Sequence, residues 1–293
     1  MKTSFIGLGA MGMHMARNLS RAGLLTACWN RTTEKAEALA AETGARVAPD
    51  PAALARESEL VIVCVSADND VLDIIDELLP GVRPGLIVVD CSTVSAATAR
   101  EAAKRLHAAG AEFLDCPVSG GVEGARDATL AIMCGGMPEA FARAEPVLKK
   151  LGRTVTHIGP TGFGQATKAT NQIMCAGIIQ AVSEAMAFAK AEGLPLEKVI
   201  ETLGKGAGSS WYFVNRAPFM ARGSFPAGFR VRLHDKDLKI CRDMAAGHNV
   251  ELPVVETTLL SYAKLIATGH GDEDISTIFR LKDALFTGGD APD

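Results

Sequence analysis

The sequence has few aromatic residues and no cluster of basic ones. Phe, Trp and Tyr make up 5% of its 293 residues, and 30 Lys and Arg stand against 34 Asp and Glu. Proteins that bind nucleic acid need clustered basic charge to replace counterions, and many stack bases on aromatic side chains. We therefore expect no nucleic-acid partner.

Cysteine spacing and apolar runs exclude further classes of protein. The seven cysteines are scattered and form no C-x-x-C pair, so buried thiols in a reducing cytoplasm fit better than a zinc site. No apolar stretch approaches the roughly 18 uninterrupted residues of a membrane span, since Lys168 and three amides interrupt the most apolar segment. The N-terminus has no signal-peptide pattern. We expect a cytoplasmic protein with no metal and no membrane partner.

The first half of the chain alternates short β-rich runs with helical stretches. Such alternation predicts a parallel sheet with helices on both faces. An unbroken apolar run at 60–65 suits a strand that is buried on both sides. The expected strands are 3–6, 25–29, 60–65, 86–90 and 112–115, and the expected helices between them include 11–22, 34–42 and 96–109.

After about Gly159 the strand signals give way to helices. The breakers in IGPTGFG place a domain boundary near Gly159–Gly164. We expect an α/β Rossmann-type domain over 1–161 that binds NADP, followed by an all-α substrate and dimerisation domain over 162–293. Apolar surface on the second domain predicts a homodimer or homotetramer. The expected helices are 164–192, 195–203, 211–221, 235–247 and 253–267.

A glycine-rich loop follows the first expected strand and opens the first expected helix. It reads G-x-G-x-x-G, in the context that dinucleotide binding requires. Its three glycines suit a tight turn, a close approach to the pyrophosphate, and close packing of helix on strand. The alternative is a plain turn between strand and helix. The expected cofactor contacts are Gly7, Leu8, Gly9, Ala10, Met11 and Gly12.

The second expected strand ends at Asn30, Arg31 and Thr32, where an NAD site usually carries a carboxylate for the ribose hydroxyls. A guanidinium can instead bind a 2′-phosphate through charge-assisted hydrogen bonds. We therefore expect NADP(H) to be preferred. Alternatively Arg31 stacks on the adenine, which leaves NAD(H) possible.

Two further strand ends face the same crevice, because ligands of such sheets bind beyond the carboxyl ends of the strands. Val65 and Ser66 stand at the end of one strand, and Thr93 stands at the end of the next. We expect all three residues to line the cofactor site.

The segment D-C-P-V-S-G-G carries a candidate site for an anion. Backbone N–H groups of Ser119, Gly120 and Gly121 can form a nest for the carboxylate of a substrate. The alternative is an ordinary glycine-rich turn.

Lys168 lies in an otherwise apolar helix of small residues. Asn171 and Gln172 follow three and four residues later and share its face. Partial desolvation of an amine lowers its pKa and allows proton exchange near neutral pH. The alternative is a solvated surface lysine.

A fourth motif, L-H-D-K-D-L, contains Lys236; alternatively it is a charged helix start with Asp235 as the N-cap. Together with the glycine loop, D-x-P-V-S-G-G and G-x-G-x-x-x-K-x-x-N, it resembles the 3-hydroxyacid dehydrogenase family in order and over nearly the whole chain. That family includes 3-hydroxyisobutyrate dehydrogenase, tartronate semialdehyde (2-hydroxy-3-oxopropionate) reductase and the glyoxylate/succinic semialdehyde reductases. His14 stands where many members carry Pro, and Ala128 where many carry Gly.

The resemblance implies a role for each matching residue. Lys168 is the catalytic acid/base, and Asn171 holds the substrate and orients the lysine. Ser119 to Gly121 bind the substrate carboxylate, Thr93 lies by the nicotinamide, and Lys236 closes over cofactor and substrate.

The resemblance also implies the substrate class. Residues 226–238 look closer to the tartronate semialdehyde reductases than to the 3-hydroxyisobutyrate dehydrogenases, whereas Arg31 is more typical of the NADPH-dependent glyoxylate/succinic semialdehyde reductases. 3-Hydroxyisobutyrate dehydrogenase remains open as well. Imine reductases share the architecture but generally lack the lysine. A non-catalytic NADP-binding module is the alternative of another class.

Overall fold

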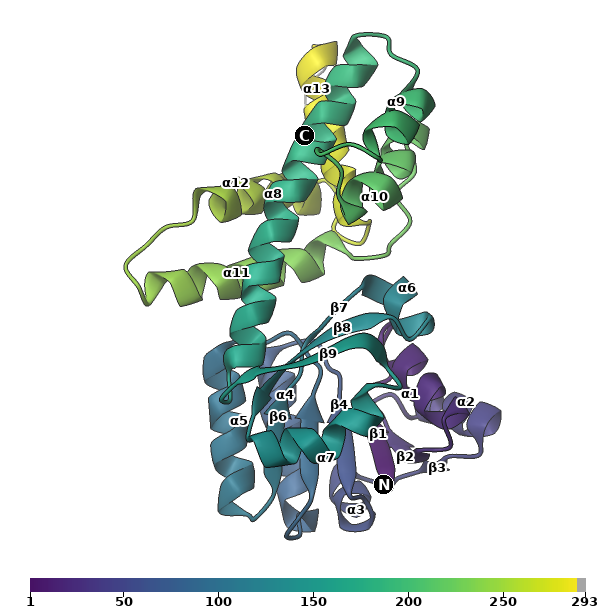
Figure 1. Ribbon diagram of the computed structural model, residues 1–293, viewed down its shortest axis with the longest axis vertical. Coiled ribbons are helices and arrows are strands. Elements are labelled where there is room, and N and C mark those ends of the chain that lie inside the picture. Colours follow the sequence, from purple (N-terminus) through teal and green to yellow (C-terminus); the bar gives the residue numbers. More distant parts are fainter. Residues whose placement is uncertain (289–293) are drawn as a thin grey trace. The chain divides into compact units, whose positions relative to one another are not determined.

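The computed structural model describes residues 1–288, which form two compact units joined through one long helix (Figure 1). The first unit covers Met1–Lys168 and the second Ala169–Asp293, so the division falls inside that helix. The final residues of the second expected domain, 289–293, lie outside the described part of the chain.

The first unit is built on a nine-stranded sheet in the order β3-β2-β1-β4-β5-β6-β8-β7, with β9 paired to β8. Strands β1 to β6 run parallel, and their order reverses between β1 and β4, where dinucleotides bind in folds of this kind. The strands are β1 (Thr3–Ile6), β2 (Leu25–Trp29), β3 (Arg46–Val47), β4 (Leu60–Val63), β5 (Ile87–Asp90), β6 (Glu112–Asp115), β7 (Val118–Ser119), β8 (Leu130–Gly136) and β9 (Gly152–Gly159).

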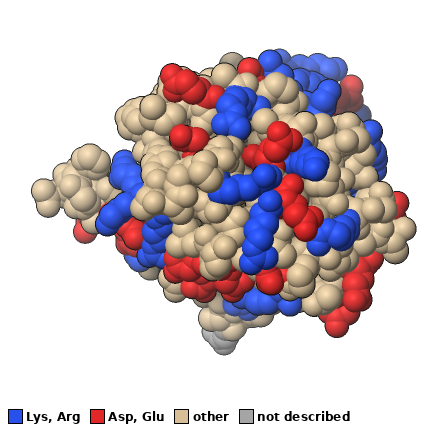
Figure 2. Space-filling view, turned by 90° about the horizontal axis from the view of Figure 1, so that it is seen from below, with Lys and Arg blue, Asp and Glu red and all other residues tan. Residues whose placement is uncertain are grey.

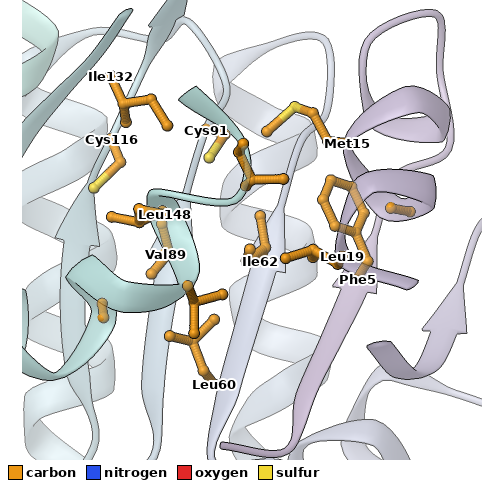
Figure 3. Close-up of a cluster of buried hydrophobic side chains, with 14 of the residues drawn as sticks. Phe5, Met15, Leu19, Leu60, Ile62, Val89, Cys91, Cys116, Ile132 and Leu148 are labelled. Carbon is orange, nitrogen blue, oxygen red and sulfur yellow. The ribbon is translucent and has the colours of Figure 1, made fainter. Parts of the chain in front are cut away.

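Helices cover both faces of this sheet. Side chains of α1, α2 and α7 pack on one face, and side chains of α3, α4 and α5 pack on the other. Figure 3 shows the first of these clusters, in which Phe5 and Ile62 from the strands meet Leu19 and Leu148 from the helices. The helices are α1 (Gly12–Arg21), α2 (Thr33–Thr43), α3 (Pro51–Glu57), α4 (Asp68–Leu78), α5 (Ala96–Ala108), α6 (Gly121–Arg126) and α7 (Pro138–Leu148).

The Rossmann-type first domain is confirmed, with one correction to the sheet. β8 pairs antiparallel to β6 and β7, so the sheet is not parallel throughout. The sequence analysis missed β8 and β9. An apolar run without alternation cannot be told from a buried helix by its periodicity, and β9 alternates exposed with half-buried residues.

The second unit is helical, as expected. It contains most of α8 (Phe163–Ala191), followed by α9 (Leu196–Leu203), α10 (Trp211–Arg222), α11 (Val231–Ala246), α12 (Pro253–Ala267) and α13 (Phe279–Thr287). Helix α11 begins four residues earlier than predicted, with Arg230 at its N-cap. The interpretation of Asp235 as an N-cap is therefore wrong; its carboxylate lies inside the helix and accepts a hydrogen bond from Lys239 at 2.7 Å.

Helix α8 is the only helix within residues 1–288 that is long and apolar enough to cross a membrane by length and composition. Half of its most apolar window is buried inside the structure, and core helices of soluble proteins meet the same criterion. On the face shown in Figure 2, basic and acidic side chains are interspersed.

A buried ion pair organises the second unit. The Asp274 carboxylate accepts hydrogen bonds from the N–H groups of Phe229 and Ser276 at 2.9 and 3.0 Å. Its Oδ2 also lies 3.4 Å from Nε of Arg216, which is 3% exposed and stacks on the ring of Trp211. The Asp274 carboxylate therefore binds the backbone at Ser276, the backbone at Phe229 and the buried Arg216 cation.

We predict that Asp274→Ala destabilises the protein by about 3–5 kcal/mol, because it removes the carboxylate beside the buried Arg216 cation and takes the acceptor from the N–H groups of Phe229 and Ser276. Denaturant unfolding followed by circular dichroism measures the loss. Asp272→Ala is the matched control: Asp272 is 66% exposed and makes only surface ion pairs, so about 0.5 kcal/mol or less is expected. Equal effects of the two substitutions would contradict the assignment.

Candidate functional site

The three glycines of the loop after β1 each meet a distinct steric demand. Gly7 has φ +94°, and a Cβ there would lie 2.2 Å from the carbonyl oxygen of Cys64. A Cβ on Gly12 would lie 1.9 Å from the carbonyl oxygen of Gly7, whereas Gly9 has nothing within 4 Å. Gly7 and Gly12 therefore allow the turn and the close packing of α1, while Gly9 presents bare backbone on an open side that a pyrophosphate can approach.

Asn30 fixes this loop from the end of β2. Its Oδ1 accepts the N–H of Leu8 at 2.8 Å, and its Nδ2 donates to the carbonyl of Thr32 at 2.9 Å. Helix α1 then begins without a side-chain cap at Met11 and without an acidic residue in its first turn. Its N-terminal N–H groups and positive dipole end suit a phosphate. The loop and helix therefore fit a dinucleotide.

Arg31 and Thr32 follow Asn30 on the surface. The side chain of Arg31 is 86% exposed, and its Nη1 lies 3.3 Å from Oδ1 of Asp70, in the first turn of α4. Thr32 is the N-cap residue of α2. This exposed guanidinium is available to a phosphate on the adenosine ribose.

The loops after β4 and β5 are tied to each other. Val65 donates its N–H to Oγ of Ser92 at 2.9 Å, and Ser92 donates its own N–H to Oδ1 of Asp90 at 2.9 Å. Ser66 is exposed on the first of these loops, and Thr93 is half-buried on the second. Both residues therefore lie at the carboxyl edge of the sheet, where the sequence analysis expected them.

Gln165, in the first turn of α8, holds the residues on either side of Thr93. Its Nε2 donates to the carbonyl of Ser92 at 2.8 Å, and its Oε1 accepts the N–H of Val94 at 3.2 Å. The Gln165 side chain is 1% exposed. The sequence analysis assigned Gln165 no role, although a buried amide in an apolar helix is a signal that it needs specific partners.

Asp115, the last residue of β6, holds the same turn from the other side. Its Oδ1 accepts the N–H of Gly162 at 2.8 Å, and its Oδ2 accepts the N–H of Gln165 at 2.9 Å. Burial raises the pKa of Asp115, and these hydrogen bonds lower it in part. A Cβ on Gly164 would lie 2.3 Å from the Asp115 carbonyl oxygen, so glycine is needed where helix and strand meet. The start of α8 is thereby fixed against the sheet.

Lys168 lies three residues beyond Gln165 on α8 and is 7% exposed. It is the only lysine among the buried residues of the chain's described part, and it is not the solvated surface lysine of the alternative interpretation. Asn171 and Gln172 occupy the i+3 and i+4 positions, and Nδ2 of Asn171 donates to Oε1 of Gln172 at 2.7 Å. The structure therefore places a buried amine on a fixed helix turn, with two amides on the same face.

The turn from β7 to α6 contains Ser119, Gly120 and Gly121. Ser119 ends β7, and the two glycines have φ +136° and +66°. These conformations suit both the anion nest and the plain glycine turn. Ala128, where many family members carry Gly, has φ +54°, so the family's glycine relieves a backbone strain that alanine accepts here.

In the second unit, Lys236 is paired with its neighbour. Nζ of Lys236 lies 3.0 Å from Oδ1 of Asp237, whose Oδ2 accepts a hydrogen bond from Nε2 of Gln172 at 2.7 Å. The buried ring of His234 lies 3.2 Å from the carbonyl of Gln172 and 2.8 Å from the Tyr262 hydroxyl. Helix α11 is thereby fixed to the third turn of α8, at Gln172. No cluster of three or more His, Cys, Asp or Glu side chains able to hold a metal is found within 1–288.

Two family models, one after the other, match most of the chain. Residues 2–159 match the NAD-binding domain of 6-phosphogluconate dehydrogenase, and residues 162–282 match the NAD-binding domain of NADP-dependent 3-hydroxyisobutyrate dehydrogenase.

Similar proteins have nearly the same length. The chain is 37% identical to an uncharacterized oxidoreductase of Synechocystis over 95% of this chain and 97% of that protein. It is 33% identical to 2-hydroxy-3-oxopropionate reductase of Escherichia coli, covering 97% of this chain and 98% of the other.

Comparison with a solved structure shows that the similarity includes the fold. The 3-hydroxyisobutyrate dehydrogenase of Mycobacterium tuberculosis, solved with L-serine, has a TM-score of 0.86 at 32% identity, over 95% of this chain and 98% of that one. With its four ordered motifs, of which the glycine loop is the first, the chain belongs to the 3-hydroxyacid dehydrogenase family of NAD(P)-dependent oxidoreductases.

Proposed function

We propose that this protein reduces a small semialdehyde bearing a carboxylate to the corresponding 3-hydroxy acid, or catalyses the reverse, with tartronate semialdehyde as the preferred substrate. The observation that carries the proposal is the buried Lys168, one helical turn after the point where Asp115 and Gln165 fix α8 to the sheet. The similarity to 2-hydroxy-3-oxopropionate reductase supports the substrate.

Each candidate residue has a chemical task in this reaction. Protonated Lys168 donates to the oxygen of the developing alkoxide during reduction, and the neutral amine accepts that proton during oxidation. General acid–base help of this kind is worth on the order of 10²–10⁴-fold. Asn171 orients the amine and the substrate oxygen. Ser119, Gly120 and Gly121 hold the substrate carboxylate.

The cofactor, when bound, supplies or accepts the hydride at the nicotinamide ring. The loop from Gly7 to Gly12 holds its pyrophosphate, and Asn30, Arg31 and Thr32 hold its adenosine ribose. The rest of the cofactor site is lined by Val65, Ser66, Thr93 and Lys236. We propose NADP(H) as the preferred cofactor because of Arg31, with NAD(H) also accepted.

The alternative functions differ from the first in their substrates. Methylmalonate semialdehyde corresponds to 3-hydroxyisobutyrate dehydrogenase, and glyoxylate or succinic semialdehyde to the other reductases of the family. L-serine is a further candidate substrate because the similar Mycobacterium tuberculosis structure contains it. An imine reductase is disfavoured by Lys168. A non-catalytic NADP-binding module would bind the cofactor without turnover of any of these compounds.

We further propose that residues 1–161 bind the cofactor, that 162–293 complete the substrate site and form the subunit interface, and that the protein works in the cytoplasm. The second unit supports an interface because it exposes large apolar side chains. Leu285, Leu260 and Met174 are 71%, 69% and 61% exposed.

Lys168→Ala is expected to lower kcat by about 10²–10⁴-fold while leaving the affinity for NADPH unchanged, because the amine moves a proton and does not hold the cofactor. The assay follows NADPH oxidation with the four aldehydes and NADP+ or NAD+ reduction with L-serine. Lys190→Ala, which removes a half-exposed amine from the same helix, is the matched control and should retain activity.

Near-wild-type turnover by Lys168→Ala would contradict the acid/base role. If the wild-type protein turns over none of the five compounds yet binds NADPH, the non-catalytic module is favoured instead.

Asp115→Asn is expected to cost about 1–3 kcal/mol of stability, because the amide can accept only one of the two N–H groups and the other is left buried. It should also lower kcat by about 10–100-fold through a displaced Lys168, without changing the Kd for NADPH. Glu112→Gln, on the same strand but paired only with surface His107, is the control and should change neither quantity. A variant that loses stability but keeps wild-type kcat would show that Asp115 does not position the lysine.

The stability difference between the wild type and Asp115→Asn should depend on pH. Burial raises the pKa of Asp115 above its ordinary value of 3.8, so the folded protein takes up this proton before the unfolded chain does. The contribution of Asp115 to stability therefore increases as the pH falls from 7 toward 4, and asparagine, which does not titrate, shows no such increase. Denaturant midpoints of both proteins across this range measure the difference.

We expect an oligomer in sedimentation velocity at micromolar concentration. Leu260→Glu should weaken it by placing a charge in the apolar contact, whereas Met137→Glu, at an exposed position of the first unit, should not. A wild-type monomer would refute the interface.

A further inference from the structure

The proposed NADP site already contains a counter-ion for its arginine. Oδ1 of Asp70 lies 3.3 Å from Nη1 of Arg31. Arg31 follows β2 and Asp70 belongs to the first turn of α4, which follows β4, so the pair joins the two loops that flank the Gly7–Gly12 loop.

The two partners differ in freedom. The Arg31 side chain is 86% exposed and that of Asp70 only 27%, so the guanidinium can turn toward a ligand while the carboxylate stays at its place on the helix. The neighbouring carboxylate of Asp68 is already engaged, since its Oδ1 accepts hydrogen bonds from Ser95 N–H and Thr98 Oγ1 at 2.9 and 2.6 Å. Asp70 is therefore the acidic residue of this turn that pairs with Arg31.

We propose that Asp70 is a specificity-determining residue that competes with the 2′-phosphate of NADP for Arg31 and so limits the preference for NADP over NAD. This inference rests on the proposed role of Arg31 in NADP binding. A bound 2′-phosphate takes the guanidinium and leaves the Asp70 carboxylate beside a second anion. Bound NAD has no such phosphate, so Arg31 keeps its pairing with Asp70.

The size of the effect follows from charge and exposure. A carboxylate and a phosphate dianion about 6 Å apart repel each other by about tenfold in affinity in bulk water before salt screening. Breaking an exposed ion pair costs about two- to fivefold. Together with screening at physiological salt, this predicts that removing the Asp70 charge raises the NADP-over-NAD affinity ratio by about 3- to 10-fold.

The test measures the Kd of NADP+ and of NAD+ by calorimetry, so that it needs no known substrate. Asp70→Asn is expected to raise the ratio of the two affinities by about 3- to 10-fold, mainly through tighter NADP+, and the gain should shrink as salt rises from about 20 to 300 mM. Any loss of helix stability from an acid in the first turn affects both cofactors alike and cancels in the ratio. Asp73→Asn removes an exposed carboxylate from the same helix and should leave the ratio unchanged.

Two Arg31 variants separate the possible failures. Arg31→Ala should lower the NADP-over-NAD ratio; an unchanged ratio would refute the proposed role of Arg31 itself. If Arg31→Ala lowers the ratio but Asp70→Asn does not raise it, the role of Asp70 alone is refuted. In the Arg31→Ala background only the direct repulsion between Asp70 and the phosphate remains, so Asp70→Asn should give a smaller gain than it gives with Arg31 present. An equal gain in the two backgrounds would refute competition for Arg31.

Discussion

A single buried carboxylate fixes where the long helix α8 begins. Asp115 accepts N–H groups from Gly162 and Gln165, which a helix end otherwise leaves without partners, and it ends the central strand β6. Burial of its charge raises the pKa of Asp115, and these hydrogen bonds offset that rise only in part. Together with the hydrogen bonds of Gln165, this anchor fixes the first turn of α8, just before Lys168, against the sheet.

The same arrangement recurs elsewhere in the protein: a polar side chain from one part of the chain holds the backbone of another part. Asn30 closes the glycine loop, and Gln165 brackets Thr93. In the second unit, Asp274 holds Arg216 and two chain segments. Each of these groups is satisfied by hydrogen bonds to fixed backbone, which makes the surrounding geometry unique as well as stable.

Asp70 has a different relation to Arg31. This pair is exposed and weak, so it places the arginine without committing it, and a ligand phosphate can replace the carboxylate. In the proposed NADP site, stronger pairing would oppose binding of the 2′-phosphate, whereas no pairing would leave the Arg31 cation without a counter-charge when NAD is bound.

Sequence patterns were enough to predict the Rossmann-type first domain, the helical second half, the glycine loop and the family. These depend on local patterns, namely strand–helix alternation, G-x-G-x-x-G and the ordered motifs. The antiparallel β8, the start of α11 at Val231, and the partners of Asp115, Gln165 and Asp70 were decided only by the tertiary structure. The physical reason is sequence distance: Asp115 and Gln165 are 50 residues apart, and Arg31 and Asp70 are 39 apart. A local sequence pattern does not show which distant polar side chain or backbone group a residue will contact at the edge of a sheet.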